Sequence, residues 1–194
     1  MVTRYSHALL VVILSVAAVT PVDSQEQKQN QAAKPARSRA EETAEVWNAI
    51  GNKLIAMAQD FPEDKYDFKV QKDERTFAQN LLHVAAVDYD LISAASGSHA
   101  GPDFGKDRHN PSRDLYKTKA DVVKLIQDAV ADGAAIIQQQ GDEGLDKISK
   151  MAWGNRVVLN SYMWTVAIEH SAEHYGQLVV YYRANGMVPP DSRR

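Results

Sequence analysis

The sequence predicts an all-α protein, an up-down four-helix bundle preceded by a signal peptide. Four segments repeat apolar residues at steps of three and four positions, which is the spacing of one buried helix face. Loops join these segments, and no strand pattern of comparable length appears in the chain. Amphipathic helices must bury their apolar faces against another element, and a helix bundle achieves this.

The first 24 residues are typical of a secretory signal peptide. Arg4 is the only early charge, and residues 8–19 are almost entirely apolar. A helix needs about 20 apolar residues to cross a bilayer, so this run is short for a membrane anchor. Val22 and Ser24 fit cleavage before Gln25, and no cysteine follows that would accept a lipid. An uncleaved signal anchor and a buried amphipathic start are the alternatives.

Charge and cysteine content narrow the classes of function. The net charge is −3, and removal of residues 1–24 takes away one base and one acid. A nucleic-acid surface would need a clustered basic face, so we expect no nucleic-acid partner. The chain contains no cysteine, so an exported domain must be held by its core. We expect a signal peptide at 1–24, a flexible linker at 25–40 and one domain at 41–194. The mature protein would be periplasmic or secreted, without stable membrane insertion.

The first two helices are delimited by local signals. The first ends at Phe61 and Pro62, and the second begins at Thr76, where Gln79 completes a capping box. The second helix extends toward Gly97. The apolar stripe of the first helix comprises Val46, Trp47, Ile50, Leu54, Met57 and Ala58.

A polar loop, Gly97 to about Tyr116, separates these helices from the last two. A long loop inside a compact domain is often functional. The third helix ends at Gly141, and an amphipathic piece from Leu145 to Trp153 is expected to lead to the fourth, which ends at Asn185 and Gly186. The stripe of the third helix comprises Val122, Val123, Ile126, Val130, Ala134 and Ile137. The stripe of the fourth comprises Leu159, Met163, Val166, Ala167, His170, His174, Leu178 and Tyr181.

Histidines on two of these helices form a candidate metal site. His170 and His174 are four residues apart and project from one helix face, the face expected in the core. Two buried imidazoles are costly unless something binds them, and neutral His is a good ligand for zinc, nickel, iron or copper. His83 supplies a third ligand from the second helix. Three His leave a coordination position open, as in catalytic sites. Alternatively, each ring is hydrogen-bonded to a neighbouring side chain. His99 and His109, in the polar loop, are left out, although a loop folded over the site would bring one near.

Residues 170–174 read H-S-A-E-H, which matches the H-x-x-E-H motif of inverzincin proteases. Those enzymes need a further carboxylate downstream, and only Asp191, in the tail, follows His174. We therefore reject a protease. Glu173 is kept as the candidate general base, although a solvated carboxylate is the simpler interpretation because its side chain points about 100° away from His174.

Two segments carry a resemblance to a known family. Residues 75–85, R-T-F-A-Q-N-L-L-H-V-A, resemble the R-T-x-x-x-x-x-x-H-h-A pattern of the DinB-like (DinB/YfiT) family. Residues 169–190 resemble its closing H-x-x-x-H-x-G-Q-L…Y-x-R-x-x-G-x-x-P-P pattern, and residues 61–70 are similar to its turn between helices one and two. The likeness spans about residues 41–194. The matching motif positions are His83, His170, His174, Gly176 and Gln177.

The resemblance implies a four-helix bundle that holds one divalent metal on three His, often as a homodimer. Relatives include thiol-dependent transferases and isomerases as well as metal-dependent hydrolases. The export signal puts thiol transfer in doubt, because those relatives use cytoplasmic thiols. We expect a metal-dependent hydrolase of a small substrate that enters near residues 97–116. Zinc or nickel is expected first, and iron or manganese otherwise. The alternatives are a non-catalytic metal-binding or stress-related envelope protein, and a thiol-dependent transferase.

Overall fold

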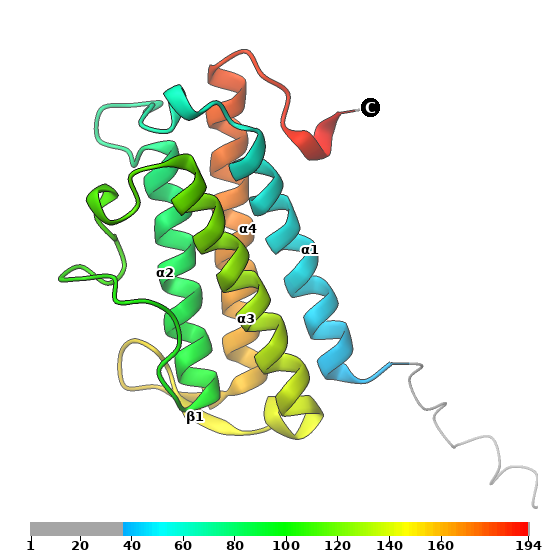
Figure 1. The fold of residues 1–194 in the computed structure, drawn as a ribbon. Helices are drawn as coiled ribbons and strands as arrows, with labels where there is room; N and C mark the ends of the chain where they lie inside the picture. The colour runs from blue at the N-terminus through cyan, green and yellow to red at the C-terminus, as the bar shows by residue number, and fades with distance from the viewer. Residues whose placement is uncertain (1–36, 194) are drawn as a thin grey trace, which may run out of the picture. The chain divides into compact units, whose positions relative to one another are not determined.

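The computed structural model describes residues 37–193, and its core is built from four helices (Figure 1). They are α1 (Arg39–Asp60), α2 (Phe77–Ser96), α3 (Lys119–Leu145) and α4 (Asn160–Ala184). α1 and α2 each pack against both α3 and α4. The expected mainly helical fold with four long helices is confirmed. The expected signal peptide lies outside the described residues, as does most of the expected linker.

Local side-chain caps explain where three of the helices begin. Ser38, Thr76 and Thr118 each cap a helix, and each forms a capping box with the residue three positions on. The box predicted at Thr76 is therefore present. Ser38 starts α1 at Arg39, so the last two residues of the expected linker belong to the helix. α2 ends at Gly97, whose φ of 74° is a left-handed conformation that glycine adopts without strain.

The order of helix directions differs from the expected up-down arrangement. The start of α1 contacts the end of α3 through Arg39 and Asp146, so these two helices are antiparallel. The end of α2 contacts the end of α3, where Gln140 Nε2 donates to the Ala95 carbonyl at 2.9 Å, so α2 and α3 are parallel. Figure 1 shows the chain returning along α2 before α3 begins. The up-down prediction is therefore wrong for this pair.

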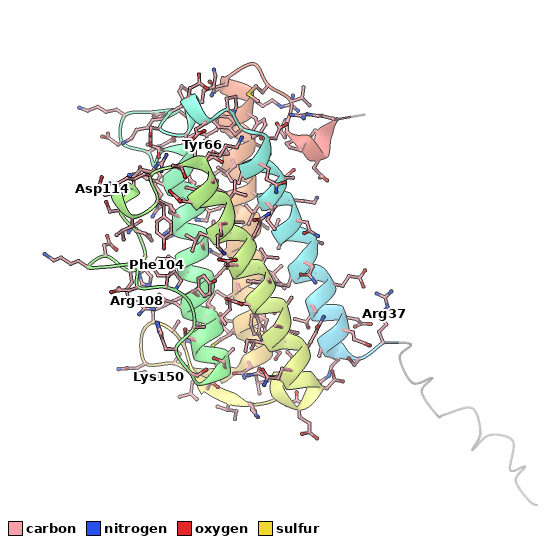
Figure 2. The ribbon with its side chains drawn as sticks, in the orientation of Figure 1. Arg37, Tyr66, Phe104, Arg108, Asp114 and Lys150 are labelled. Atoms are coloured by element: carbon pink, nitrogen blue, oxygen red, sulfur yellow. The ribbon has the colours of Figure 1, made fainter. Side chains whose placement is uncertain are left out.

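The connection between α2 and α3, residues 97–118, is long enough to make this return. α2 has 20 residues and is about 30 Å long, a distance that about ten extended residues cover. Buried Phe104 holds the connection against Tyr89 of α2, with ring centroids 6.0 Å apart. Phe104 and Arg108 mark its course in Figure 2. It contains one 3-10 turn, Arg113–Leu115. We call residues 97–118 the crossover loop.

The segment between α3 and α4 also differs from the prediction. Gly141 interrupts α3 with a φ of 60°, but helical structure resumes as far as Leu145. The expected amphipathic piece is a β-hairpin of β1 (Ile148–Lys150) and β2 (Val157–Leu159). Three-residue strands are too short to produce a recognisable alternation in the sequence. Leu159, expected in the apolar stripe of the fourth helix, precedes α4 and is 46% exposed.

Close contact between α1 and α3 forms one side of the core. Gly133 lies against the indole of Trp47, and Trp47 Nε1 donates to the Val130 carbonyl at 2.8 Å. Trp47 also meets Trp164 of α4 edge to face, with centroids 5.7 Å apart. Two short 3-10 turns, Glu63–Lys65 and Pro190–Ser192, follow α1 and α4. Within residues 37–193, no helix has the length and apolar character needed to span a membrane.

Candidate metal site

Antiparallel packing of α2 against α4 brings the three predicted histidines together. His83 comes from α2, and His170 and His174 come from α4. Their ligand atoms all lie within 4.8 Å of one another. The Nε2 atoms of His83 and His170 are 3.2 Å apart, and the three ring centroids are separated by 4.6 to 5.1 Å.

Hydrogen bonds fix the proton position on two of the rings. The Nδ1 atom of His83 lies 2.5 Å from the carbonyl oxygen of His109, which only accepts, so Nδ1 carries the proton. The Nδ1 atom of His174 lies 3.2 Å from Asn80 Oδ1. Asn80 is oriented because its Nδ2 donates to the Thr76 carbonyl and the Tyr181 hydroxyl. In the neutral rings of His83 and His174, Nε2 is therefore a free lone-pair donor.

Burial keeps these imidazoles uncharged. Desolvation, with a smaller contribution from the charge of its neighbours, lowers the pKa of His170 to about 4. The same causes lower the pKa of His174 to about 3. Burial also lowers the pKa of His83. At neutral pH all three rings are in the form that coordinates metal ions.

The cluster fits a divalent transition metal. Zinc–nitrogen bonds of about 2.0–2.1 Å in a tetrahedral site imply nitrogen atoms about 3.3 Å apart, close to the observed separation of His83 and His170. Two lone pairs facing each other at this distance repel unless a proton or a cation lies between them. The Nδ1 atom of His170 is buried and has no hydrogen-bond partner among residues 37–193. The alternative of ordinary core histidines requires that neighbouring side chains form hydrogen bonds with all three rings. The unpartnered Nδ1 atom shows that they do not.

A comparison with protein-family models assigns the chain to a family. A sequence model described as the DinB superfamily matches residues 21–178. The chain belongs to the DinB superfamily. The resemblance inferred from the two motif segments is therefore confirmed.

Two solved structures share the fold of this DinB-superfamily protein. One is a DinB-like protein from Bacillus cereus, with a TM-score of 0.65, 17% identity, and coverage of 77% of this chain and 95% of that chain. The other is the DinB-like protein YjoA from Bacillus subtilis, with a TM-score of 0.60, 21% identity, and coverage of 79% and 99%. At these identities the likeness concerns the fold alone. A comparison with curated proteins finds no match.

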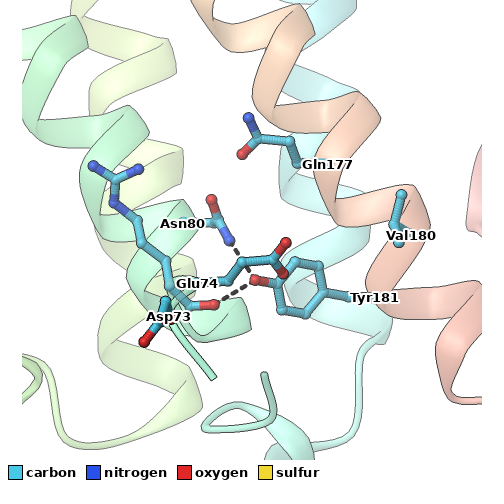
Figure 3. A pocket seen from close by; sticks show the side chains of 7 residues that line it. Asp73, Glu74, Asn80, Gln177, Val180 and Tyr181 are labelled. Carbon is cyan, nitrogen blue, oxygen red and sulfur yellow. Dashed lines mark hydrogen bonds between the residues drawn. The ribbon is translucent and has the colours of Figure 1, made fainter. Parts of the chain in front are cut away.

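A cavity of about 610 Å³ in this DinB-superfamily protein, with mostly polar and charged lining residues, shares Asn80 with the surroundings of the histidines, none of which lines it (Figure 3). Asn80 belongs to both, because it lines the cavity and bonds to His174. The Tyr181 hydroxyl donates to the Arg75 carbonyl and accepts from Asn80 Nδ2 at 3.1 Å. In Figure 3 the Glu74 side chain extends toward Tyr181. The cavity is lined by Asp73, Glu74, Arg75, Asn80, Gln177, Val180 and Tyr181.

The crossover loop was expected at the substrate entrance, and it lines two other cavities. Arg108 and His109 line one of about 770 Å³, and Asn110 and Pro111 line one of about 170 Å³ together with Arg75, which also lines the cavity next to Asn80. That cavity of about 610 Å³ is bounded, among residues 37–193, by the segment before α2, by α2 and by α4, without the loop. Glu173, the candidate base, is exposed on α4 and is not part of the histidine cluster.

Sequence reasoning missed the groups that orient the histidines. Asn80 precedes His83 by three residues on α2, so a buried Asn on that apolar face was a usable signal. The His109 carbonyl had no comparable signal, because every residue carries a backbone carbonyl. Only the path of the crossover loop identifies it.

Proposed function

We propose that this protein is a metal-dependent hydrolase of a small substrate, with one divalent metal on His83, His170 and His174. One observation supports the proposal most strongly. Three neutral imidazoles, two of them with fixed tautomers, converge, and Asn80, which bonds to one of them, lines a polar cavity. Zinc or nickel is the proposed metal, with iron or manganese as the alternative. Export to the periplasm or medium and assembly as a homodimer remain proposals that rest on the sequence.

The chain supplies the orientation that such chemistry needs. A divalent metal acts as a Lewis acid that lowers the pKa of a water molecule and polarises a substrate oxygen. Asn80 and the His109 carbonyl hold two of the rings with Nε2 toward the cluster. A set of three His ligands leaves room for a further ligand, as catalytic sites do. The cavity volume of about 610 Å³ is within the usual range for small-molecule sites.

Two carboxylates compete for the role of general base. Glu173 is next to His174 in the sequence, but it is exposed and lies outside the cluster. Glu74 lines the cavity and extends toward Tyr181 (Figure 3). We keep Glu173 as the proposed base, and a comparison of Glu173→Gln with Glu74→Gln tests it. A loss of kcat in Glu74→Gln alone would transfer the role to Glu74.

The experiment that tests the function begins with elemental analysis. The chain from Gln25 onward is purified without a His tag, beside the double variant His83→Ala, His174→Ala. His99→Ala is the control, because His99 is exposed and outside the cluster. We expect about one equivalent of a transition metal in the native and control proteins and none in the double variant. No metal in the native protein, even after reconstitution, would overturn the proposal.

Metal removal separates catalysis from a structural role. A chelator should abolish turnover in a screen of ester, amide and phosphoester substrates. The melting temperature should change only modestly, because the bundle has an extensive apolar core of its own. If the metal-free protein unfolds and the loaded protein hydrolyses nothing, the ion is a structural element. That result would favour the non-catalytic alternative.

A further inference from the structure

A carboxylate on α2 with little solvent exposure holds the crossover loop beside the metal site. Asp90 follows His83 by seven residues, or two helical turns, so both project from the same face of α2. Only 10% of the Asp90 side chain is exposed. Its Oδ1 atom accepts from Arg108, with Nε at 3.1 Å, and its Oδ2 atom lies 2.9 Å from His109 Nε2. Both carboxylate oxygens therefore contact consecutive residues of the loop.

These two residues are the ones that bring a backbone carbonyl to His83. The His109 carbonyl accepts from His83 Nδ1, and Nε2 of the His109 ring makes a close polar contact with Asp90. The edge of that ring also meets Trp153 in the hairpin connection, with centroids 6.4 Å apart. The next residue, Asn110, accepts from Arg75 Nε at 3.2 Å and from Nη2 at 2.8 Å.

We propose that Asp90 is a positioning residue for the metal site. It acts through Arg108 and His109 by fixing the loop where the His109 carbonyl selects the Nδ1–H tautomer of His83. The proposal rests on the proposed function, because the tautomer matters for the metal that Nε2 would bind. Hydrogen bonds of this kind to ligand imidazoles commonly account for 10–100-fold in metal affinity.

An irregular loop does not hold one carbonyl at a fixed point without anchors, because ordering each residue costs conformational entropy. The crossover loop has a second anchor at its far end, where Arg113 Nε donates to Asp67 Oδ1 at 3.2 Å. The Asp67 side chain is 69% exposed, and Arg113 lies beyond the residues that reach His83. The two anchors provide a matched pair, since each is an aspartate bound to an arginine of one loop.

The test compares Asp90→Asn with Asp67→Asn in the chain from Gln25 onward. Zinc affinity is measured by competition with a chromophoric chelator. We expect Asp90→Asn to weaken zinc binding about tenfold. Asp67→Asn should stay within about twofold of the native affinity, because the Asp90 anchor is intact. Native affinity in Asp90→Asn would overturn the proposal.

A second measurement does not depend on the metal. Nitrogen-15 NMR of the metal-free protein reports which ring nitrogen of His83 carries the proton. We expect the Nδ1–H tautomer in the native protein and a mixture in Asp90→Asn. If the native protein binds no metal but the tautomer shifts as expected, the proposed function fails and the positioning role stands. An unchanged tautomer would contradict the positioning role whatever the metal result.

Variants of His109 test whether the effects of Asp90→Asn come from the loop contact or from a folding defect. Every residue at position 109 keeps the backbone carbonyl, so only its placement changes. His109→Gln keeps a polar side chain that can contact Asp90 and should preserve both the tautomer and the zinc affinity. His109→Ala removes this contact and should reproduce Asp90→Asn. Equal behaviour of the two His109 variants would contradict the proposal.

Discussion

The α1–α3 and α2–α4 interfaces differ in what they bury. Between α1 and α3, glycine and indole surfaces meet closely, as where Gly133 lies against Trp47. All six buried polar residues within residues 37–193 belong to α2, its N-cap or α4. These residues are Thr76, Asn80, Asp88, Asn160, Ser171 and His174.

Because of this difference, we expect the α1–α3 interface to determine stability and the α2–α4 interface to determine metal binding. Apolar burial and close packing contribute most to folding free energy, and the α1–α3 interface supplies both. Buried polar groups cost free energy unless they are bonded, and α2–α4 satisfies most of its polar groups with one another. Substitutions at the first interface should therefore change stability without changing the metal site. Substitutions at the second should change metal binding or pH dependence more than packing.

The largest effect is expected at Trp47. Trp47→Ala leaves a cavity between α1 and α3 and removes the hydrogen bond to the Val130 carbonyl. We expect a loss of about 3–5 kcal/mol in the free energy of unfolding, measured by urea denaturation. The folded fraction should still bind metal with native affinity. Val46→Ala is the control, because Val46 is 51% exposed and should change stability by less than about 0.5 kcal/mol. A fall in the metal affinity of Trp47→Ala would show that the α1–α3 interface also supports the metal site.

At the second interface the expected effect is on binding. Asn80→Ala removes the acceptor that fixes the His174 tautomer. We expect metal affinity to fall about 10–100-fold, measured by chelator competition. Asn52→Ala, an exposed position on α1, is the matched control and should leave the affinity unchanged. Native affinity in Asn80→Ala would show that this hydrogen bond does not orient the ligand.

Asp88 should give the interface a pH dependence. Burial raises the pKa of Asp88 well above its ordinary value of 3.8, with a smaller opposing effect from the Ser171 hydroxyl. The folded protein keeps the proton that the unfolded chain loses, so stability falls as pH rises from about 4 through the folded-state pKa. Asp88→Asn does not lose stability in this way. Its free energy of unfolding relative to that of the native protein, measured by urea denaturation, should therefore increase between pH 5 and pH 8.

At pH 8 the advantage of Asp88→Asn should reach about 1–3 kcal/mol, the usual cost of a buried polar group without all its partners. The metal-free proteins are compared, and the difference between them cancels the titration of the histidines. A constant difference across this pH range would show that Asp88 is ionised in the folded protein.

The smallest effects come from one substitution made at two glycines. At Gly133 an added Cβ would lie 2.4 Å from Trp47 Cζ2, so Gly133→Ala should be destabilising. At Gly176, exposed on α4, nothing lies within 4 Å of the added atom. Gly176→Ala should therefore stabilise the protein by about 0.5–1 kcal/mol, the usual gain in a helix interior. Thermal melts should show shifts of opposite sign, and shifts of equal sign would refute the close contact at Gly133.

The sequence was sufficient for features that depend on local patterns. Residues close together in the sequence determine the helix periodicity, the capping box at Thr76 and the spacing of His170 and His174. The structure contains each of these features. The direction of α3 was not predictable in this way. It depends on the return of the crossover loop, which leaves no period in the sequence. The same loop supplies the His109 carbonyl. The unpredicted path of the loop therefore explains why both the direction of α3 and the carbonyl contact to His83 were missed.

The start of α4 is stabilised differently from the starts of the other three helices. Leu159 gives it no side-chain cap, and Asn160 instead donates to the Lys147, Ala95 and Gly144 carbonyls, which belong to other parts of the bundle. The start of α4 therefore depends on contacts that exist only in the folded bundle. Because α4 carries two of the three histidines, the site is completed only when the bundle is assembled. A chain still being synthesised has no such cluster to compete for metal, so the ion would be acquired by the finished fold.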